Sequence, residues 1–262
     1  MKYGFIGCGN MGGAIARALS TSTKEILLAD RAEQKAKDLA SELGISFGTN
    51  EEAVNYSDVL FLAIKPQMAE SAIGEIKDPI KAKKPILISM LAGVAIEKIK
   101  TLVGDESIPV IRILPNTPVA VGKGVILYHA SEEVPEDALQ QILADLVPAG
   151  TLDELEEKLI DAAGTLSGCG PAYMYMFLNA LADGAVACGV PRDKALLYAK
   201  LTMAGSAELA LKSGKHPEQL KDEVCSPGDT TIQGVKALEE GGFRDAAISA
   251  ILAAYEKTIK LG

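Results

Sequence analysis

Short apolar runs alternate with amphipathic stretches through the first half of the chain. The apolar runs predict strands at 3–6, 26–29, 59–64, 85–89 and 109–114. Amphipathic stretches such as 31–43 and 66–77 lie between these runs and predict helices. Further along, 124–130 is predicted as a strand, 135–147 as a helix and 150–155 as a short strand or turn. Strands spaced by helices are typical of a mostly parallel, doubly wound sheet that is covered on both faces.

The hydrophobic pattern changes in the second half of the chain. The segment 172–190 is apolar nearly all round, which predicts a buried helix. The next helix is predicted over 191–214, because a proline favours its start and a glycine its end. Further helices are predicted to begin near Pro217, Thr230 and Phe243. No strand is expected after residue 165, so this half is predicted to be all-α.

Two domains follow from this change of pattern. We expect an α/β Rossmann-type domain over 1–160 and an all-α domain over 161–262. A helix as apolar as 172–190 needs cover on every side. In a domain of about a hundred residues, a partner subunit is the expected source of that cover, which predicts self-association. The alternative is burial among the domain's own helices.

Composition and charge narrow the possible partners. The chain of 262 residues is 48% apolar and has a net charge of −9, which disfavours a nucleic-acid backbone or an anionic membrane surface as its main partner. No apolar run reaches the ~20 residues that span a bilayer. The four cysteines form no C-x-x-C pair, which indicates free thiols in a reducing cytoplasm, and no metal site is predicted.

A glycine motif follows the first predicted strand. In "GFIGCGNMGGAIARAL", Gly7, Gly9 and Gly12 form G-x-G-x-x-G between that strand and an apolar-periodic helix. The first glycine permits a tight turn, the second lets the backbone approach a pyrophosphate, and the third lets helix and strand pack closely. The free N–H groups of the helix start favour phosphates. The motif therefore predicts a dinucleotide site, and the alternative is a tight turn without a ligand.

Two residues at the end of the second strand give opposing indications about the cofactor. Asp30 follows Gly9 by about twenty residues, where an acid normally bonds the ribose hydroxyls and favours NAD. Arg31 is next to it, and a guanidinium there favours the 2′-phosphate of NADP. NADPH and NADH are both candidates.

The entry to the second domain lacks a residue that hydroxyacid dehydrogenases of this two-domain plan usually carry. Their lysine protonates a carbonyl oxygen, whereas "LSGCGPAYMYMFLNAL" offers Tyr173, Met174 and Met176 on the corresponding face. The two histidines, His129 and His216, lie in a strand pattern and a helix-start turn and are expected to be structural. An iminium already carries its proton and accepts hydride directly, so orientation supplies most of the acceleration. These observations favour reduction of a C=N bond.

A polar turn interrupts the apolar helical domain at "CSPGDTTIQGV", where a helix restarts directly. A helix start that follows such a turn presents N–H groups at 228–231 to an anion, and Thr230 and Thr231 add hydroxyls. We expect the turn to bind a substrate carboxylate. The alternative is that Ser226 or Asp229 only caps the helix.

Six blocks of the sequence resemble pyrroline-5-carboxylate reductase. They run from the first strand to the last helix and read "GFIGCGNMG", "FLAIKPQ", "ISMLAGV", "RILPNTP", "LSGCGPAYMYMF" and "LKDEVCSPGDTTIQGVKALEEGGF". The resemblance implies reduction of 1-pyrroline-5-carboxylate to L-proline with NADPH or NADH, the last step of proline synthesis. It also implies a Rossmann domain followed by an all-α dimerisation domain whose helices interlock between subunits, with dimers often assembled into larger rings.

The resemblance also implies site residues. Those on the cofactor are, in order along it, Gly7, Gly9, Asn10 and Met11 at the pyrophosphate, Asn50 on the adenosine side, Ala63, Lys65 and Pro66, and finally Ala92, Gly93, Asn116, Thr117 and Pro118 near the nicotinamide. Those on the substrate are Ser226, Gly228, Asp229, Thr230 and Thr231, with the Thr231 hydroxyl on the ring nitrogen as the catalytic contact. Asp229 stands where the family usually has a small residue.

Two other functions are weighed against this one. The first is a different imine or hydroxyacid dehydrogenase of the same architecture, and the missing lysine and the "CSPGDTT" turn disfavour it. The second is a nucleotide-binding redox sensor without catalytic activity. A sensor binds the cofactor without oxidising it in the presence of substrate, so a turnover assay distinguishes a sensor from an enzyme.

Overall fold

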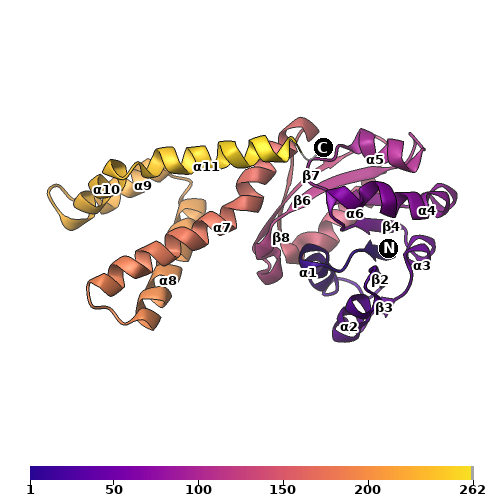
Figure 1. The fold of residues 1–262 in the computed structure, drawn as a ribbon, viewed down its shortest axis with the longest axis horizontal. Coiled ribbons are helices and arrows are strands. Elements are labelled where there is room, and N and C mark those ends of the chain that lie inside the picture. The colour runs from indigo at the N-terminus through magenta and orange to yellow at the C-terminus, as the bar shows by residue number, and fades with distance from the viewer. Residues whose placement is uncertain (261–262) are drawn as a thin grey trace. The chain divides into compact units, whose positions relative to one another are not determined.

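The computed structural model describes residues 1–260. By compactness the chain divides into two units, which we describe separately (Figure 1). The sheet unit consists of Met1–Cys169 and the described residues from Ala254 onward, and the helical unit consists of Gly170–Ala253. The division falls within one helix, α7 (Glu157–Ala187), whose first part belongs to the sheet unit.

The sheet unit is built on one eight-stranded sheet, in the order β3-β2-β1-β4-β5-β6-β7-β8. Only β7 runs against its neighbour β6, and all other pairs of strands are parallel. The strands are β1 (Tyr3–Ile6), β2 (Ile26–Ala29), β3 (Ser46–Phe47), β4 (Val59–Leu62), β5 (Ile86–Ser89), β6 (Val110–Pro115), β7 (Gly124–Ala130) and β8 (Gly150–Glu154). The order reverses between β1 and β4, and such a switch point opens a crevice at the carboxyl ends of the strands.

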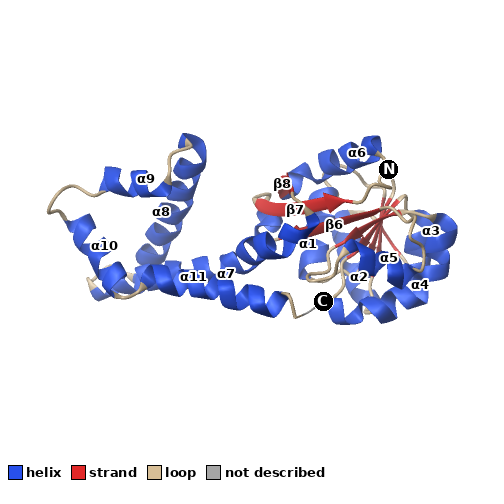
Figure 2. Cartoon of the chain, turned by 90° about the horizontal axis from the view of Figure 1, so that it is seen from above, coloured by secondary structure: helices blue, strands red, loops and turns tan. Residues whose placement is uncertain are grey.

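Helices cover both faces of the sheet (Figure 2). One face packs against α1 (Asn10–Leu19), α2 (Glu33–Leu43) and α6 (Glu136–Leu146). The other face packs against α3 (Asn50–Tyr56), α4 (Ala69–Lys83) and α5 (Ile96–Val103). Three short 3-10 helices complete the unit: Pro66–Met68, Thr117–Val121 and Val147–Ala149. This arrangement confirms the predicted doubly wound α/β fold.

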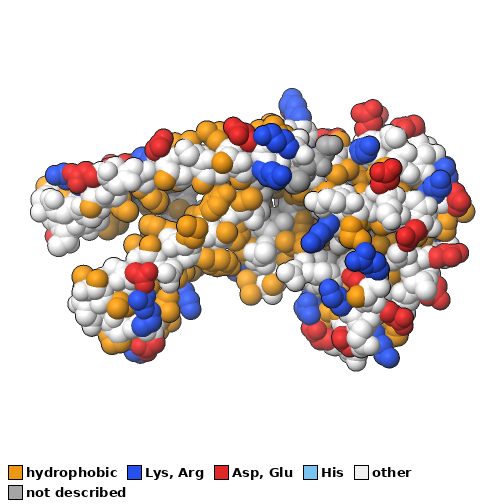
Figure 3. Space-filling model, in the orientation of Figure 1, with side chains coloured by type: hydrophobic (Ala, Val, Ile, Leu, Met, Phe, Trp, Pro, Cys, Tyr) orange, Lys and Arg blue, Asp and Glu red, His pale blue; other side chains and the backbone are white. Residues whose placement is uncertain are grey.

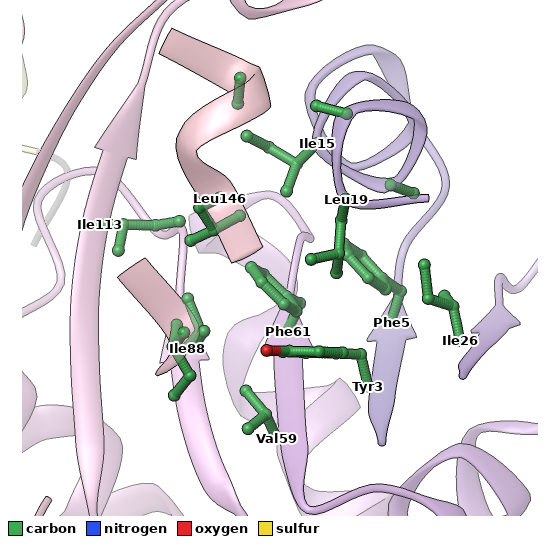
Figure 4. Packing of buried hydrophobic residues seen from close by; sticks show 14 of the residues in the cluster. Tyr3, Phe5, Ile15, Leu19, Ile26, Val59, Phe61, Ile88, Ile113 and Leu146 are labelled. Carbon is green, nitrogen blue, oxygen red and sulfur yellow. The ribbon is translucent and has the colours of Figure 1, made fainter. Parts of the chain in front are cut away.

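Successive side chains of β1 and β4 point to opposite faces of the sheet and so contribute to two separate cores. Tyr3, Phe5 and Phe61 point to one face, where Phe5 and Phe61 stack with ring centroids 4.2 Å apart (Figure 4). Ile6 and Leu62 point to the other face. All five are at most 2% exposed. Burial on both faces explains why these strands appear in the sequence as continuous apolar runs rather than as alternating patterns.

The helical unit contains the rest of α7 followed by four helices and no described strand. These are α8 (Arg192–Ser213), α9 (Pro217–Val224), α10 (Thr230–Glu240) and α11 (Phe243–Thr258), the last of which ends in the sheet unit. Their starts confirm the predicted helices near 191, 217, 230 and 243. Large apolar side chains lie exposed along these helices (Figure 3), including Tyr175, Met176 and Leu201. The alternative that the domain's own helices bury 172–190 is therefore wrong, and cover by a partner subunit stays the prediction.

Helix α7 begins earlier than the predicted start at 172. It runs from Glu157 through three glycines and Pro171, residue types that disfavour a helix interior. Among residues 1–260, no helix has the length and apolar character needed to cross a bilayer.

Candidate active site

The glycine loop after β1 has the geometry that its spacing predicts. Gly7 has φ +104°, and a Cβ there would lie 2.3 Å from the Ala63 carbonyl oxygen. A Cβ on Gly12 would lie 2.3 Å from the Gly7 carbonyl oxygen. Gly9 differs, because its added Cβ would meet nothing within 4 Å. Two glycines are therefore required by the fold itself, while Gly9 leaves open space against the backbone where a phosphate group fits.

The start of α1 faces the same space with unused backbone donors. Gly9 is the N-cap residue, and no side chain caps the helix. The first N–H groups of a helix have no acceptor within it, so those in the turn that begins at Asn10 and Met11 attract an anion, aided by the helix dipole. These are the two residues that, with the glycines, the resemblance assigns to the pyrophosphate.

A cavity of about 840 Å³ lies at this edge of the sheet unit. Its size is within the range of small-molecule and cofactor sites. Seven of the predicted cofactor residues line it: Gly7, Gly9, Asp30, Arg31, Asn50, Ala63 and Lys65. The lining also includes residues that the sequence analysis did not select: Ile6, Glu33, Lys35, Phe47, Gly48, Thr49, Glu52, Ile64, Met68, Ser71, Ala72 and Glu75. The open Gly9, the uncapped helix start and the volume of this cavity together fit a dinucleotide.

Asp30 has a second role in the loop. One of its oxygens accepts a hydrogen bond from the Cys8 amide at 2.7 Å, and the other accepts one from the Ala32 amide at 2.8 Å. The carboxylate thus fixes the glycine loop and still offers lone pairs to a ribose. Burial, followed by the charge of Asp30, raises the pKa of the Cys8 thiol to about 12, so Cys8 stays protonated. A reactive role for this cysteine is disfavoured.

The start of α3 shapes the side of the cavity that the resemblance assigns to the adenosine. Thr49 and Glu52 form a reciprocal capping box, in which the Thr49 hydroxyl accepts from the Glu52 amide at 3.1 Å and Glu52 accepts from the Thr49 amide at 2.8 Å. This box fixes Asn50 as the first residue of the helix. The T-x-x-E spacing is visible in the sequence and is the signal that would have revealed this helix start.

The loop after β5 contains Ala92 and Gly93, which the resemblance places near the nicotinamide. Gly93 has φ +75°, in the left-handed region, and its amide donates to Asp161 at 3.1 Å. The loop follows the carboxyl end of a strand next to β4, on the opposite side of the switch point from Asp30. This is where the nicotinamide half of a dinucleotide extends when its adenosine half lies over β2.

Asn116 has a structural role that its sequence context does not reveal. Its Nδ2 donates to the Ser167 carbonyl at 3.0 Å, and its Oδ1 accepts from the Val125 amide at 2.9 Å. Pro171 lies four residues beyond Ser167 in α7 and cannot donate the helical hydrogen bond to that carbonyl. Asn116 supplies a donor in its place, which explains how α7 continues through a proline. Contacts of Asn116, Thr117 and Pro118 with a cofactor, like that of Pro66, stay predictions.

The predicted substrate turn lies in the helical unit, where it precedes α10. Gly228 has φ +75°, and the Asp229 amide donates to the Ser226 carbonyl at 3.2 Å. Asp229 is the N-cap of α10, and its carboxylate accepts from the Thr230 amide at 2.7 Å. The expectation that all amides of 228–231 are free is therefore wrong for Asp229 and Thr230. Thr231 is half-buried and is not the capping residue, so capping does not explain its hydroxyl.

Both histidines hold the backbone in place, as expected. The Nδ1 atom of His129 lies 2.9 Å from the Leu155 carbonyl oxygen. His216 is the N-cap of α9, where its Nδ1 accepts from the Glu218 amide at 3.2 Å. Over residues 1–260, no group of three or more His, Cys, Asp or Glu side chains is placed to hold a metal ion.

Comparison with known proteins decides the family. Residues 157–261 match the family model for pyrroline-5-carboxylate reductase dimerisation, and residues 2–93 match that for NADP oxidoreductase, coenzyme F420-dependent. The chain is 39% identical to a pyrroline-5-carboxylate reductase of Synechocystis, with 100% of this chain and 98% of that protein covered. A relative of the same name in Arabidopsis thaliana is 38% identical, with 99% of this chain and 95% of that protein covered. The chain belongs to the pyrroline-5-carboxylate reductase family.

A solved structure of the family agrees with the architecture. The Plasmodium falciparum pyrroline carboxylate reductase with NADP bound superposes with a TM-score of 0.90 at 30% identity, and it covers 100% of this chain and 98% of that one. Membership confirms an oxidoreductase that uses NAD(P)H, a small-molecule substrate and a chain that forms homo-oligomers through its C-terminal region. The preference between NADPH and NADH stays open.

Proposed function

We propose that this protein reduces the C=N bond of 1-pyrroline-5-carboxylate to L-proline, the last step of proline biosynthesis. The cavity of about 840 Å³ at the open Gly9 is the observation that carries the proposal, because it gives the chain a dinucleotide site at a sheet switch point. The bound reduced nicotinamide supplies the hydride. The protonated imine carries the charge that the hydride neutralises, so the chain need not provide a separate acid for a carbonyl oxygen.

The residues divide this work between the two units. In the sheet unit, Gly9 and the start of α1 hold the pyrophosphate, while Asp30, Arg31 and Asn50 hold the adenosine side. The loops at Lys65 and Pro66, at Ala92 and Gly93, and at Asn116, Thr117 and Pro118 orient the nicotinamide end. In the helical unit, Ser226, Gly228, Asp229, Thr230 and Thr231 form the substrate turn.

The substrate turn binds an anion with few charges of its own. The amides of Thr231 and Ile232 lie in the first turn of α10, where the helix provides no acceptor for them, and they bind the substrate carboxylate. The Thr231 hydroxyl hydrogen-bonds the ring nitrogen and so fixes which carbon receives the hydride. Asp229 caps the helix, and its cap bond directs the carboxylate toward the Thr230 amide rather than toward the substrate.

Assembly and location complete the proposal. Helical units of two copies interlock through the exposed apolar side chains of α7 and α8, and such dimers form a larger ring. The protein works in the cytoplasm, in keeping with its free cysteines. We assign cofactor binding to a domain over 1–160, and substrate binding and dimerisation to a domain over 161–262.

Oxidation of NADPH or NADH with 1-pyrroline-5-carboxylate, followed by absorbance, tests the proposal. We expect turnover with at least one of the two cofactors, proline as the product, and at least hundredfold lower catalytic efficiency with a 2-oxo acid of the same length. A carbonyl substrate that outcompetes the imine would favour the hydroxyacid dehydrogenase alternative. Tight cofactor binding without oxidation would favour the redox sensor.

A further inference from the structure

One arginine is buried in the sheet unit beside the carboxyl end of β5. Arg112 on β6 is 2% exposed and pairs in register with Ser89, the last residue of β5. Its guanidinium lies 2.5 Å from an Asp161 oxygen and 3.7 Å from a Glu157 oxygen. Both carboxylates lie in the first part of α7. Burial of a cation is costly unless it is paired, so these contacts fix Arg112 in one place.

The same two carboxylates bind the loop that follows β5. The Asp161 oxygen that contacts Arg112 also accepts from the Gly93 amide at 3.1 Å. The Glu157 oxygen that faces Arg112 accepts from the Ile96 amide at 2.7 Å. Ile96 is the first residue of α5, whose N-cap Ala95 provides no side-chain cap. Glu157 therefore caps α5 from another helix, where the helix dipole favours a negative charge.

These contacts join three elements at one point. Each carboxylate oxygen connects the fixed guanidinium to one backbone N–H. The two N–H groups belong to Gly93 and Ile96, so both ends of the segment 93–96 are held. The left-handed conformation of Gly93, with φ +75°, is held by one of these bonds. We call Arg112, Asp161 and Glu157 the carboxylate clamp.

We propose that the carboxylate clamp is a positioning device for hydride transfer, which holds the Ala92–Gly93 loop against the nicotinamide end of the cofactor. The inference rests on the proposed function. Hydride transfer requires the reacting atoms within about 3–3.5 Å, and a shift of 1 Å in a supporting group lowers the rate by as much as a hundredfold. The clamp does not touch the reacting atoms, so its three members are positioning residues and not catalytic ones.

The test compares three clamp variants with a control. Asp161→Ala removes the acceptor of the Gly93 amide, Asp161→Asn keeps an acceptor oxygen without the charge, and Arg112→Lys keeps the charge without the planar fork. The control is Tyr3→Phe, which removes the hydrogen bond of 2.5 Å between the Tyr3 hydroxyl and Asp145 of α6, two residues that are not part of the clamp. Each variant is compared with wild type for amide hydrogen exchange without cofactor, for melting temperature and for kinetics.

We expect Asp161→Ala to speed exchange of the Gly93 amide at least tenfold, and to lower kcat at least tenfold with a KM for the imine within threefold of wild type. Asp161→Asn should restore most of the protection of the Gly93 amide and most of kcat. For both quantities, Arg112→Lys should give values between those of the two Asp161 variants. Tyr3→Phe should lower only the melting temperature. If Asp161→Ala does not fold, Arg112→Lys and Asp161→Asn carry the comparison.

Unchanged Gly93 exchange in the clamp variants would overturn the inference, as would a kcat equal to that of wild type. A wild type that does not reduce the imine would overturn the proposed function instead, and the exchange measurement would still decide whether the clamp holds the loop.

Discussion

Phe5 and Phe61 of the sheet unit are fully buried by this one chain, whereas Tyr175 and Met176 of the helical unit are 63% and 73% exposed. Among the described residues of Gly170–Ala253, the buried apolar residues are three alanines. The sheet unit thus has cores on both faces of its sheet without a partner. The helical unit is equally apolar in sequence, but it does not enclose its large apolar side chains. We therefore expect cofactor binding to need one chain only, and the exposed apolar face of the helical unit to be covered by a second copy.

The largest effect is expected from a charge on the exposed face of α7. Met176→Glu would bury an unpaired carboxylate at the interface, and an effective penalty of about 4 kcal/mol corresponds to a dimer dissociation constant roughly a thousandfold higher. Light scattering at micromolar concentration measures the mass. The control is Val147→Glu, which puts the same charge on an exposed apolar residue of the sheet unit, 61% exposed, and should leave the dimer intact. An unchanged mass for Met176→Glu would break the comparison.

The glycine loop gives the next largest effect and tests the independence of the sheet unit. Gly9→Val adds atoms only to open space, so the fold should keep its melting temperature and its dimer mass, while cofactor affinity falls at least a hundredfold, or about 2.7 kcal/mol. Gly12→Val should behave differently, because its Cβ meets the Gly7 carbonyl at 2.3 Å and the unit must distort. Isothermal calorimetry with NADPH and NADH measures the affinity. Normal binding by a folded Gly9→Val would remove the phosphate assignment.

Thr231→Val separates substrate binding from helix capping in the helical unit. The change keeps the branched shape and removes the hydroxyl, so loss of a hydrogen bond to a charged or polar partner should lower catalytic efficiency about ten- to a hundredfold, or roughly 1.5–3 kcal/mol. Cofactor affinity should not move. His216→Ala removes a true N-cap, that of α9, and should lower the melting temperature with near-normal kinetics. If Thr231→Val behaves like His216→Ala, the turn is only structural.

Asp30 is expected to give the smallest effect, since it acts at a solvated edge of the cavity. Asp30→Asn removes the charge that repels a 2′-phosphate but keeps an oxygen for the Cys8 amide, which Asp30→Ser would lose. We expect the ratio of catalytic efficiencies, NADPH over NADH, to rise roughly fivefold, or about 1 kcal/mol at a screened site. A constant ratio would mean that Asp30 only supports the glycine loop.

The sequence predicted the elements whose pattern is local. Strands such as Ile26–Ala29 and Gly124–Ala130 have the predicted limits, because their apolar runs end at turn residues. The strand Ser46–Phe47 was missed, since two residues carry no period. Helix α5 was missed because Glu157, a distant residue, caps its start, and α3 was missed although its capping box is local. The early start of α7 was missed because Asn116, a distant residue, supplies the donor that Pro171 lacks.

The candidate site was predictable to a similar extent. The glycine motif and the acidic residue after β2 follow a spacing rule, and the structure brings both to one cavity. The carboxylate clamp was not foreseen, although Arg112 stands as a charged residue inside the apolar run "PVIRIL". A charged residue within an apolar run indicates a buried charge. The partners of Arg112 are Glu157 and Asp161, which lie 45 and 49 positions further along the chain and cannot be identified without the fold.

Transfer of deuterium tests the central claim most directly. The wild-type protein is given 1-pyrroline-5-carboxylate with NADPH or NADH that carries deuterium in both positions at the nicotinamide C4, and the product is examined by NMR. The account predicts L-proline with one deuterium at C5, formed in a one-to-one ratio to the cofactor oxidised. Cofactor that binds with no labelled proline formed, or deuterium found on a hydroxyl-bearing carbon of another product, would contradict it.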